Sequence, residues 1–354
     1  MNNITTVIPE ITIGVDVSDK YSHICAVDNM GEVIEESKIP TKPDAFRHRF
    51  TCNPARIVIE AGTHSLWIDK TLRELGHEVI VANPRKLNMI FQNDDKDDKV
   101  DAHILARMGR FDPSLLSPIE HRKEEEQEHL EVIKARDILV RFRTALVNHI
   151  RGAAKTLGYK LVDCSTGSFD KKVAVQLPES LLMSISPLLE MIGELTRKIL
   201  AFDKQIEALC KKNYPVTSAL RQVNGVGPLT ALAYVLSIGD PYRFKNSRAV
   251  GSYIGLRPRR DDSGERKSQL HITKAGNNFL RRLLTSSAQY ILGPFGKDCN
   301  LRRWGLGKSL GGGKIAKKRA VVGVARKLAV LLHRLWITGE TYEPLRNAEI
   351  IVNE

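Results

Sequence analysis

Short segments that alternate between apolar and polar residues, or run apolar throughout, fill the first part of the chain and predict β-strands. Residues 11–17 and 22–28, followed by 32–39 after the turn Asn29-Met30-Gly31, predict an antiparallel meander. The segments that follow predict a helix near 43–51, a strand at 56–60, a helix at about 64–75, a strand at 77–82 and a helix at about 98–109. The order βββαβαβα predicts an α/β domain with a mixed sheet.

A helical periodicity replaces this pattern in residues 121–212. Apolar residues recur there at four- and three-residue intervals, most regularly in Leu188, Ile192, Leu195, Ile199, Phe202, Ile206 and Leu209. Ser186-Pro187 predicts the N-cap and first turn of that helix. The intervals form a heptad seam, which fits an antiparallel hairpin within one chain and a coiled coil between two chains equally well. The sequence leaves both arrangements open.

The last third of the chain begins near Tyr214 and is predicted to be mainly α-helical. Gly225-Val226-Gly227 lies between two helical segments, and such a helix-hairpin-helix-like element either contacts a phosphate through its backbone or serves as a structural turn. Residues 305–313 are glycine-rich and predict a mobile segment, whereas residues 314–335 predict an amphipathic basic helix. The predicted domains are 1–120, 121–213, 214–338 and a tail at 339–354.

The formal net charge is +13, and the positive charge is concentrated in the C-terminal third. Residues 240–338 contain 22 Lys and Arg against 5 Asp and Glu, whereas the rest of the chain contains 32 against 36. This local excess indicates a polyanionic partner such as nucleic acid. The five cysteines are widely spaced, no signal peptide is recognisable, and no apolar run reaches the roughly 18 residues that span a bilayer. We therefore expect a soluble cytoplasmic protein.

Four carboxylates occupy positions from which they can face one object. Asp16 and Glu60 each end a predicted strand. Asp98 and Asp101 lie three residues apart at the start of a predicted helix, so they share a helix face. Each acid alone is more often a turn residue or a helix N-terminal acid. The four in this order predict a divalent-metal site for phosphodiester chemistry, and they make the α/β domain RNase H-like.

Ser263 is the second candidate for chemistry. A Ser-Gly pair after a basic loop is most often a turn. A serine hydroxyl among arginines can instead attack a phosphodiester, because guanidinium groups stabilise the charge that develops on the phosphorus oxygens. The arginines near Ser263 are Arg257, Arg259, Arg260 and Arg266.

At these residues the chain resembles the DEDD-type transposases of the insertion-sequence one-ten family, which includes the Piv-type DNA invertases. The N-terminal match is carried by Gly14-Val15-Asp16, Ile59-Glu60-Ala61 and Lys96-x-Asp98-x-x-Asp101-Ala102. The C-terminal match is carried by Val223-Asn-Gly-Val-Gly-Pro, Arg243-Phe244, Gly255-Leu-Arg-Pro-Arg, Ser263-Gly264, Lys274-Ala-Gly and Leu280-Arg-Arg. Asp97 stands where the family commonly has a small hydroxylated residue, and Asp94 and Asp95 lie nearby, so the register of the helix pair stays open.

The resemblance implies a RuvC-like RNase H domain, a coiled-coil linker and a C-terminal transposase domain. Asp16, Glu60, Asp98 and Asp101 match the family's metal-binding tetrad, which implies Mg²⁺ or Mn²⁺ as cofactor, and Ser263 matches the serine that links covalently to DNA. The resemblance further implies a structured guide RNA, encoded by the element itself, that pairs with donor and target DNA. It also implies assembly as dimers and tetramers, in a bacterial cytoplasm and at the nucleoid during activity.

The sequence therefore predicts a metal-dependent DNA recombinase of an insertion sequence that works through a covalent serine–DNA intermediate. One alternative is a structure-specific, Holliday-junction-type endonuclease that uses water as nucleophile. A second alternative is a non-catalytic nucleic-acid-binding protein. The predicted contacts to nucleic acid are Gly225, Gly227, Arg257, Arg259, Arg260, Arg266, Lys274, Arg281, Arg282, Lys314, Lys317 and Lys318.

Overall fold

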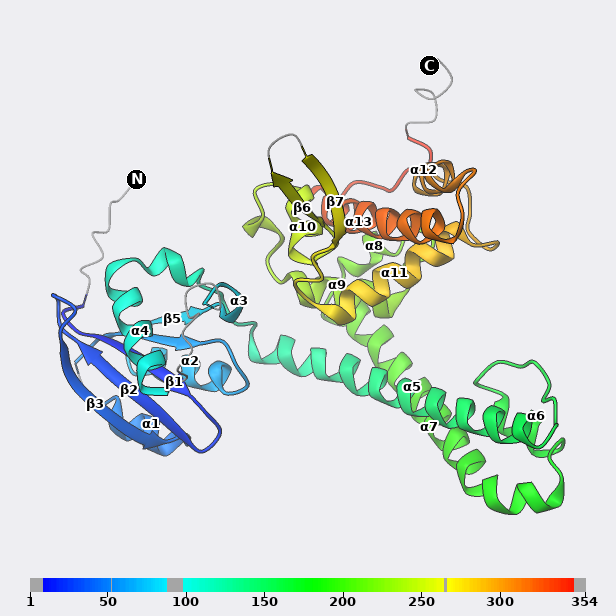
Figure 1. Ribbon diagram of the computed structural model, residues 1–354, viewed down its shortest axis with the longest axis horizontal. Coiled ribbons are helices and arrows are strands. Elements are labelled where there is room, and N and C mark those ends of the chain that lie inside the picture. Colours follow the sequence, from blue (N-terminus) through cyan, green and yellow to red (C-terminus); the bar gives the residue numbers. More distant parts are fainter. Residues whose placement is uncertain (1–8, 52, 88–97, 264–265, 347–354) are drawn as a thin grey trace. The chain divides into compact units, whose positions relative to one another are not determined.

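The computed structural model describes residues 9–51, 53–87, 98–263 and 266–346 (Figure 1). The chain divides into two compact units, Met1–Arg122 and Lys123–Glu354, and each is described by itself. The first unit is a mixed α/β sheet domain and the second is mostly helical. The predicted fold class, an α/β domain followed by a mainly helical region, is confirmed at this level.

Strands of the first unit form one five-stranded sheet in the order β3-β2-β1-β4-β5. They are β1 (Thr12–Val17), β2 (Tyr21–Val27), β3 (Val33–Pro40), β4 (Arg56–Glu60) and β5 (Glu78–Ala82). Strand β2 is antiparallel to both β1 and β3, whereas β4 is parallel to both β1 and β5. Each strand begins and ends within one residue of its predicted bounds.

Helices cover both faces of this sheet. They are α1 (Pro43–Arg49), α2 (Ser65–Glu74), α3 (Pro84–Leu87), α4 (Asp98–Phe111) and the short 3-10 helix η1 (Pro113–Leu116). Ile13 of β1 and Ile57 of β4 pack against α1 and α2 on one face. Val58, the next residue of β4, packs with Leu105 of α4 on the other face. Successive side chains of a strand point to opposite faces, so both faces of the sheet are buried.

Helix α4 lies directly on the backbone of strand β1 at Gly14. A Cβ atom at Gly14 would lie 2.0 Å from the carbonyl oxygen of Ala102 and 2.5 Å from the amide nitrogen of Ala106. Further along α4, a Cβ atom at Gly109 would lie 2.2 Å from Cγ2 of Val58. Small residues on both surfaces therefore set the distance between helix and sheet.

Arginine side chains tie the second half of α4 to the rest of the unit. Arg56, at the start of β4, is buried and donates from Nη1 to the carbonyl oxygen of Gly109 at 3.1 Å. The same guanidinium forms an ion pair with Glu78 at 3.0 Å, which compensates its charge. Arg110 of α4 donates to the carbonyl oxygen of Pro9 at 2.7 Å. These contacts fix both the position and the rotation of α4 on the sheet.

The second unit consists of two long helices, a helical bundle and a β-hairpin. Its elements are α5 (Glu124–Thr156), α6 (Phe169–Ala174), α7 (Glu179–Lys212), α8 (Thr217–Leu220), α9 (Pro228–Ile238), η2 (Pro241–Arg243), α10 (Ser247–Tyr253), β6 (Pro258–Ser263), β7 (Arg266–Ile272), α11 (Asn278–Leu292), α12 (Asn300–Ser309) and α13 (Lys314–Thr338).

Helices α5 and α7 form an antiparallel hairpin within the chain (Figure 1). Arg136 of α5 forms an ion pair with Asp203 of α7 at 2.9 Å, and Arg143, further along α5, donates to Thr196, which is earlier in α7. One of the two arrangements that the heptad seam left open is therefore present. A coiled coil between two chains stays a prediction.

The predicted start of α7 at Ser186-Pro187 is wrong, because the helix begins at Glu179 and contains Pro187. Proline lacks the N–H that would bond to the carbonyl oxygen four residues earlier, at Met183. Met183 is 78% exposed, so water can bond to that carbonyl group. Ile185 is buried in the same core as Phe169 of α6, and this packing stabilises the turns before the proline.

Helices α9 and α13 build the core of the bundle. Tyr234 of α9 is fully buried, and its hydroxyl donates to the carbonyl oxygen of Ala329 in α13 at 2.7 Å. The predicted basic helix at 314–335 is confirmed as α13, which extends to Thr338. The predicted mobile segment is wrong for its first half, because Gly305 is a buried residue of α12 that lies against Leu292 and Val324.

Two further segments differ from their predicted form. The basic loop before Gly264 is a strand, β6, which pairs antiparallel with β7. The charged residues Arg259-Arg260-Asp261-Asp262 leave no apolar alternation that would have marked it. The described part of the predicted tail is held on the bundle, because the carbonyl oxygen of Pro344 accepts the N–H of Asn300 at 2.8 Å.

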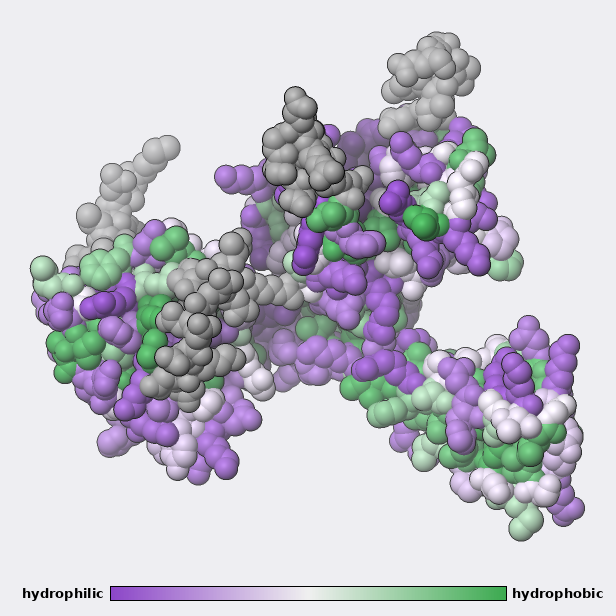
Figure 2. All heavy atoms as spheres, in the orientation of Figure 1, coloured by the Kyte–Doolittle hydropathy of each residue, from purple (hydrophilic) through white to green (hydrophobic). Residues whose placement is uncertain are grey.

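Hydrophilic residues cover most of the visible face of the helical bundle, whereas apolar residues gather at the end of the α5–α7 hairpin beside α6 (Figure 2). Val175 and Met183, in that region of the chain, are 85% and 78% exposed. Of the helices that the structure describes, none is long and apolar enough to cross a membrane.

We expect the Gly14→Ala variant to destabilise the first unit by about 1–3 kcal/mol, as overpacking does in a tight core. The new Cβ atom would collide with the backbone of α4. Hydrogen–deuterium exchange in β1 and α4 of the full chain measures the effect. Gly152→Ala on α5 is the control, because a Cβ atom there meets nothing within 4 Å. Equal protection in both variants would contradict the close packing of α4 on β1.

Candidate active site

Two of the predicted carboxylates lie at the ends of neighbouring parallel strands. The register of β1 and β4 pairs Val15 with Ile59, so Asp16 and Glu60 follow side by side at the carboxyl ends of their strands. Both acids are half-buried. Val15 and Ile59 point into the core beneath α1 and α2. Asp16 and Glu60 are therefore directed to the opposite face, which α4 covers.

Asp101 of α4 belongs to the same group of acids. It precedes Ala102, whose backbone contacts β1 at Gly14. Burial raises the pKa of the Glu60 carboxyl, and the negative charge of Asp101 raises this pKa further. A like charge has this effect only where the two carboxylates lie near each other. The fold therefore brings Asp101 near Glu60 and places both on the same face of the sheet as Asp16, although the three are far apart in the sequence.

Asp98 is the first residue of α4, three residues before Asp101. Its side chain lies outside the described part of the structure, and so do Asp94, Asp95 and Asp97 entirely. Among the side chains that are described, no three His, Cys, Asp or Glu gather closely enough to hold a metal ion. The role of Asp98 as the fourth ligand stays a prediction.

Strand β2 adds a histidine that the sequence analysis did not select. His23 pairs with Asp16 in the antiparallel ladder of β1 and β2, and directly opposite residues of such a ladder share a face. His23 is half-buried and therefore lies on the α4 face beside the acids. A lone histidine in a strand has no distinguishing pattern, and only the register of the meander could have placed it next to Asp16.

Ser263 is the last residue of β6 and pairs with Arg266, the first residue of β7. The backbone therefore places Ser263 at the turn end of the hairpin in the second unit. The connecting residues 264–265 and the side chains of Ser263, Arg260 and Arg266 lie outside the described part of the structure. The use of Ser263 as a nucleophile stays a prediction.

The glycines of the predicted helix-hairpin-helix-like element lie in the turn between α8 and α9. Gly225 has φ +92° and packs against α11, where a Cβ atom would lie 3.2 Å from the carbonyl oxygen of Ser287. Turn conformation and packing are therefore sufficient reasons for a glycine here. Gly227 caps α9, and a Cβ atom at this position would meet nothing within 4 Å.

Of the ten cationic residues predicted to bind nucleic acid, eight have described side chains, all except Arg260 and Arg266. The exposed ones are Arg257, Arg259, Lys274, Arg282, Lys314, Lys317 and Lys318. By contrast, Arg281 donates to the carbonyl oxygens of Ile254 and Ala275, at 2.9 and 3.1 Å. Arg282, although exposed, forms an ion pair with Asp137 of α5 at 2.7 Å. These two arginines hold α11 in place within the protein.

Comparison with known protein families gives two matches. A family model of DEDD-type IS110 transposases matches residues 13–157, which include all four predicted acids. A second model, described as "Transposase IS116/IS110/IS902 family", matches residues 217–295, which include Ser263. The two matches together cover well over half of the chain, and both describe transposases.

Curated relatives agree with these matches over nearly the whole chain. The chain is 26% identical to the transposase for insertion sequence element IS1111A of Coxiella burnetii, over 93% of this chain and 90% of that protein. It is 27% identical to a probable family 20 transposase of Pseudomonas aeruginosa, over 79% and 83% of the two chains. It is 24% identical to the transposase for element IS1328 of Yersinia enterocolitica, over 80% and 85%.

The class of protein defined by these findings is a DNA transposase of an insertion sequence. Within that class, the chain belongs to the IS110 family. The resemblance inferred from the sequence motifs is thereby confirmed.

The raised pKa of Glu60 predicts a pH dependence of stability in the metal-free protein. Between the ordinary pKa of a glutamate and its raised value in the fold, the folded state binds more protons than the unfolded state. The free energy of unfolding therefore falls as the pH rises through that interval. The Glu60→Gln variant removes this fall, so its stability relative to the wild type increases with pH.

Urea unfolding of the full chain in the presence of a chelator, from about pH 4 to about pH 7, measures this difference. The Asp101→Asn variant is the matched test of the cause, because it removes the charge that raises the pKa of Glu60 further. Its profile is expected to lie between those of the wild type and Glu60→Gln. Parallel profiles for all three proteins would contradict the proximity of the two carboxylates.

Proposed function

We propose that this transposase cuts and rejoins DNA at a divalent-metal site formed by Asp16, Glu60, Asp98 and Asp101. The observation that carries the proposal is the meeting of the carboxyl ends of β1 and β4, which bear Asp16 and Glu60, with helix α4, which bears Asp101. The raised pKa of Glu60 supports the proximity of Asp101. Two carboxylates that repel each other in a half-buried position are poorly explained as a stabilising element. Ligation of a divalent cation would explain why the fold holds them near each other.

The proposed domain type is RNase H-like. Its support is the strand order β3-β2-β1-β4-β5, in which an antiparallel meander is extended by two parallel strands. The acids lie on the first strand, on the fourth strand and on the helix that follows the fifth. In this arrangement, residues of separate elements converge at one end of the sheet.

The donor chemistry of the site fits a hard cation. Carboxylate oxygens are the ligands that Mg²⁺ and Mn²⁺ prefer. A bound divalent cation would polarise the scissile phosphate and stabilise charge on the leaving oxygen. The contribution of the protein is the rigid placement of α4 on β1, which holds Asp101 opposite the strand ends.

In the proposed strand cleavage, the hydroxyl oxygen of Ser263 attacks the phosphorus atom. The bond between Ser263 Oγ and phosphorus forms while the bond from phosphorus to the 3′ oxygen breaks. The proton lost by Ser263 is balanced by the proton gained by the 3′ hydroxyl group. Because the phosphoserine ester retains a phosphodiester bond, a new 3′ hydroxyl can attack it and rejoin the DNA without ATP.

The proposed partners are donor and target DNA and a guide RNA encoded by the element. The support for a nucleic-acid partner is the excess of cations in residues 240–338 together with the transposase family. We further propose that the active assembly is a dimer or a tetramer. The support for the role of the guide RNA and for this assembly is the family resemblance alone.

Metal binding is expected to stabilise the first unit. At a Mg²⁺ concentration of about 100 times Kd, the free energy of unfolding should rise by about 2.7 kcal/mol, because the ion binds only the folded state. Thermal unfolding of the full chain with and without Mg²⁺ measures this gain. The Asp16→Ala variant should lose it, and Asp44→Ala, an exposed acid of α1, should keep it. An equal gain in all three proteins would place the ion elsewhere.

A covalent protein–DNA adduct is expected when the protein is incubated with Mg²⁺, the flanking RNA of its element and end-labelled junction DNA, and then denatured. Ser263→Ala and Asp16→Ala should each reduce the adduct by at least about 10³-fold, because each removes a group that acts in the chemical step. Ser268→Ala, in the other strand of the same hairpin, is the matched control. Omission of the RNA tests the proposed guide.

Other results of this experiment decide between the alternatives. Free cleaved DNA, without an adduct and without dependence on Ser263, would identify a water-using endonuclease. DNA that is bound but neither cut nor linked would identify a nucleic-acid-binding protein without catalytic activity.

A further inference from the structure

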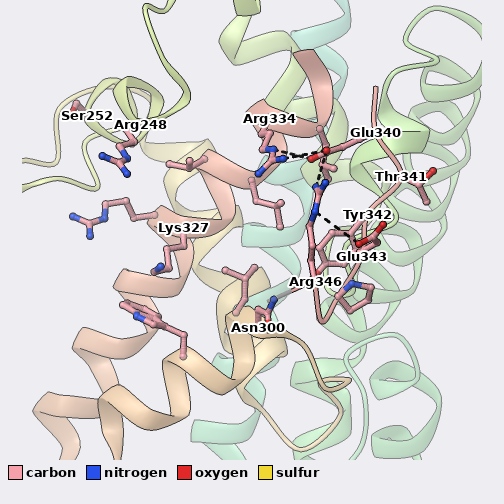
Figure 3. Close-up of a pocket in the computed structure, with 18 of the residues that line it drawn as sticks. Arg248, Ser252, Asn300, Lys327, Arg334, Glu340, Thr341, Tyr342, Glu343 and Arg346 are labelled. Atoms are coloured by element: carbon pink, nitrogen blue, oxygen red, sulfur yellow. Dashed lines mark hydrogen bonds and ion pairs between the residues drawn. The ribbon is translucent and has the colours of Figure 1, made fainter. Parts of the chain in front are cut away.

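A groove with a volume of about 600 Å³ lies in the second unit, between α10, α12, α13 and the segment that follows α13 (Figure 3). It contains none of the four predicted acids, and Arg257 at its edge lies just before the strand β6 that ends at Ser263. Six of its lining residues are cations, namely Arg248, Arg257, Arg326, Lys327, Arg334 and Arg346. Two are acids, Glu340 and Glu343. We call it the basic groove.

One side of the basic groove holds cations that the fold does not neutralise. Arg248 of α10 and Lys327 of α13 are exposed, and Arg326 is half-buried with its stem against Gly251. Within the described part of the chain, none of the three forms an ion pair with a carboxylate. The ammonium nitrogen of Lys327 lies over the ring of Trp304, 4.6 Å from the ring centre. Several cations around one concave surface attract an anionic ligand, because their fields add in the groove.

The other side of the basic groove already contains an anion from the chain itself. Glu340 forms ion pairs with Arg334, at 2.9 Å through Oε1, and with Arg346, at 2.9 Å through Oε2. Figure 3 shows this network on the side opposite Arg248 and Lys327. Hydrogen bonds from Arg346, with a further contribution from Arg334, lower the pKa of Glu340. The carboxylate is therefore ionised at neutral pH and occupies a position that suits a phosphate oxygen.

We propose that the basic groove binds the phosphodiester backbone of a nucleic acid through Arg248, Arg326 and Lys327, and that Glu340 competes for the two arginines at its other side. The helical arrangement supports this, because α10 and α13 present their cations toward one cavity from two directions. Arginine pairs with phosphate in two-point contacts, whereas lysine acts as a point charge. The nature of the polyanion rests on the proposed function, but binding itself does not depend on the metal site or on Ser263.

The first test removes cations from the groove. Binding of short labelled duplex DNA, single-stranded DNA and RNA to the full chain is followed by fluorescence anisotropy over a range of salt concentrations, with a chelator present. The double variant Arg326→Gln/Lys327→Gln should weaken binding and lower the slope of log K against log salt by about 2, because two phosphate contacts are lost. Lys171→Gln/Lys172→Gln, an adjacent exposed pair on α6, is the control and should leave the slope unchanged.

The second test is expected to change the affinity in the opposite direction. Glu340→Gln should tighten binding and steepen the salt dependence by up to about 2, because it releases Arg334 and Arg346. Asp298→Asn is its control, since it adds the same charge and releases Arg303, which does not line the groove. Circular dichroism and melting temperature confirm that each variant is folded.

The proposal is supported if the expected changes in affinity and salt slope occur with duplex DNA, single-stranded DNA or RNA and are absent in the controls. The nucleic acid that shows them is the polyanion bound. The proposal is overturned if Arg326→Gln/Lys327→Gln behaves as its control in all three arms, or if Glu340→Gln behaves as Asp298→Asn. Because a chelator is present and no strand is cut, a failure of the catalytic proposal leaves these outcomes unaffected. If the covalent adduct is absent while binding in the groove is intact, the catalytic proposal fails and the groove proposal stands.

Discussion

The contact between helix α4 and strand β1 at Gly14 is the constraint on which the candidate active site depends. With no side chain at Gly14, the backbone of α4 rests on the sheet, and Asp101 is carried to within electrostatic reach of Glu60. Close-packed interiors resist displacement, and the bond from Arg56 to Gly109 opposes sliding of the helix. The acids are therefore placed by packing, because their own charges would drive them apart.

In this arrangement, apolar packing stabilises a geometry that the repulsion between the carboxylates destabilises. Burial alone makes an ionised Glu60 unfavourable, and Asp101 adds to that unfavourable energy. The fold tolerates this because the apolar cores on both faces of the sheet stabilise the same geometry. A protein that keeps carboxylates in such a position retains destabilisation that a cation would relieve, which is the usual relation between a functional site and the scaffold that supports it.

The sequence predicted what local periodicity determines, and it failed where distant packing decides. Strand bounds were accurate to one residue because the strands are continuous or alternating apolar segments. The position of the acids at strand ends followed from the same pattern. Pro187 inside α7 and Gly305 inside α12 were misassigned, because burial of neighbouring apolar groups overrides the local tendency of proline and glycine to interrupt a helix. His23 was missed, because it acquires its place only through the β1–β2 register.

The cations of the second unit also show that the sequence does not reveal which contacts distant packing creates. Composition predicted a basic region. A net charge, however, contains no information on which cations form ion pairs within the protein. Arg282 is bound to Asp137, whereas Arg326 has no carboxylate partner within the described residues, although the two are equivalent in any count. What distinguishes them is the neighbourhood that α5, α10 and α13 create. Net charge therefore predicts the class of ligand, and the tertiary partners of each cation determine where that ligand can bind.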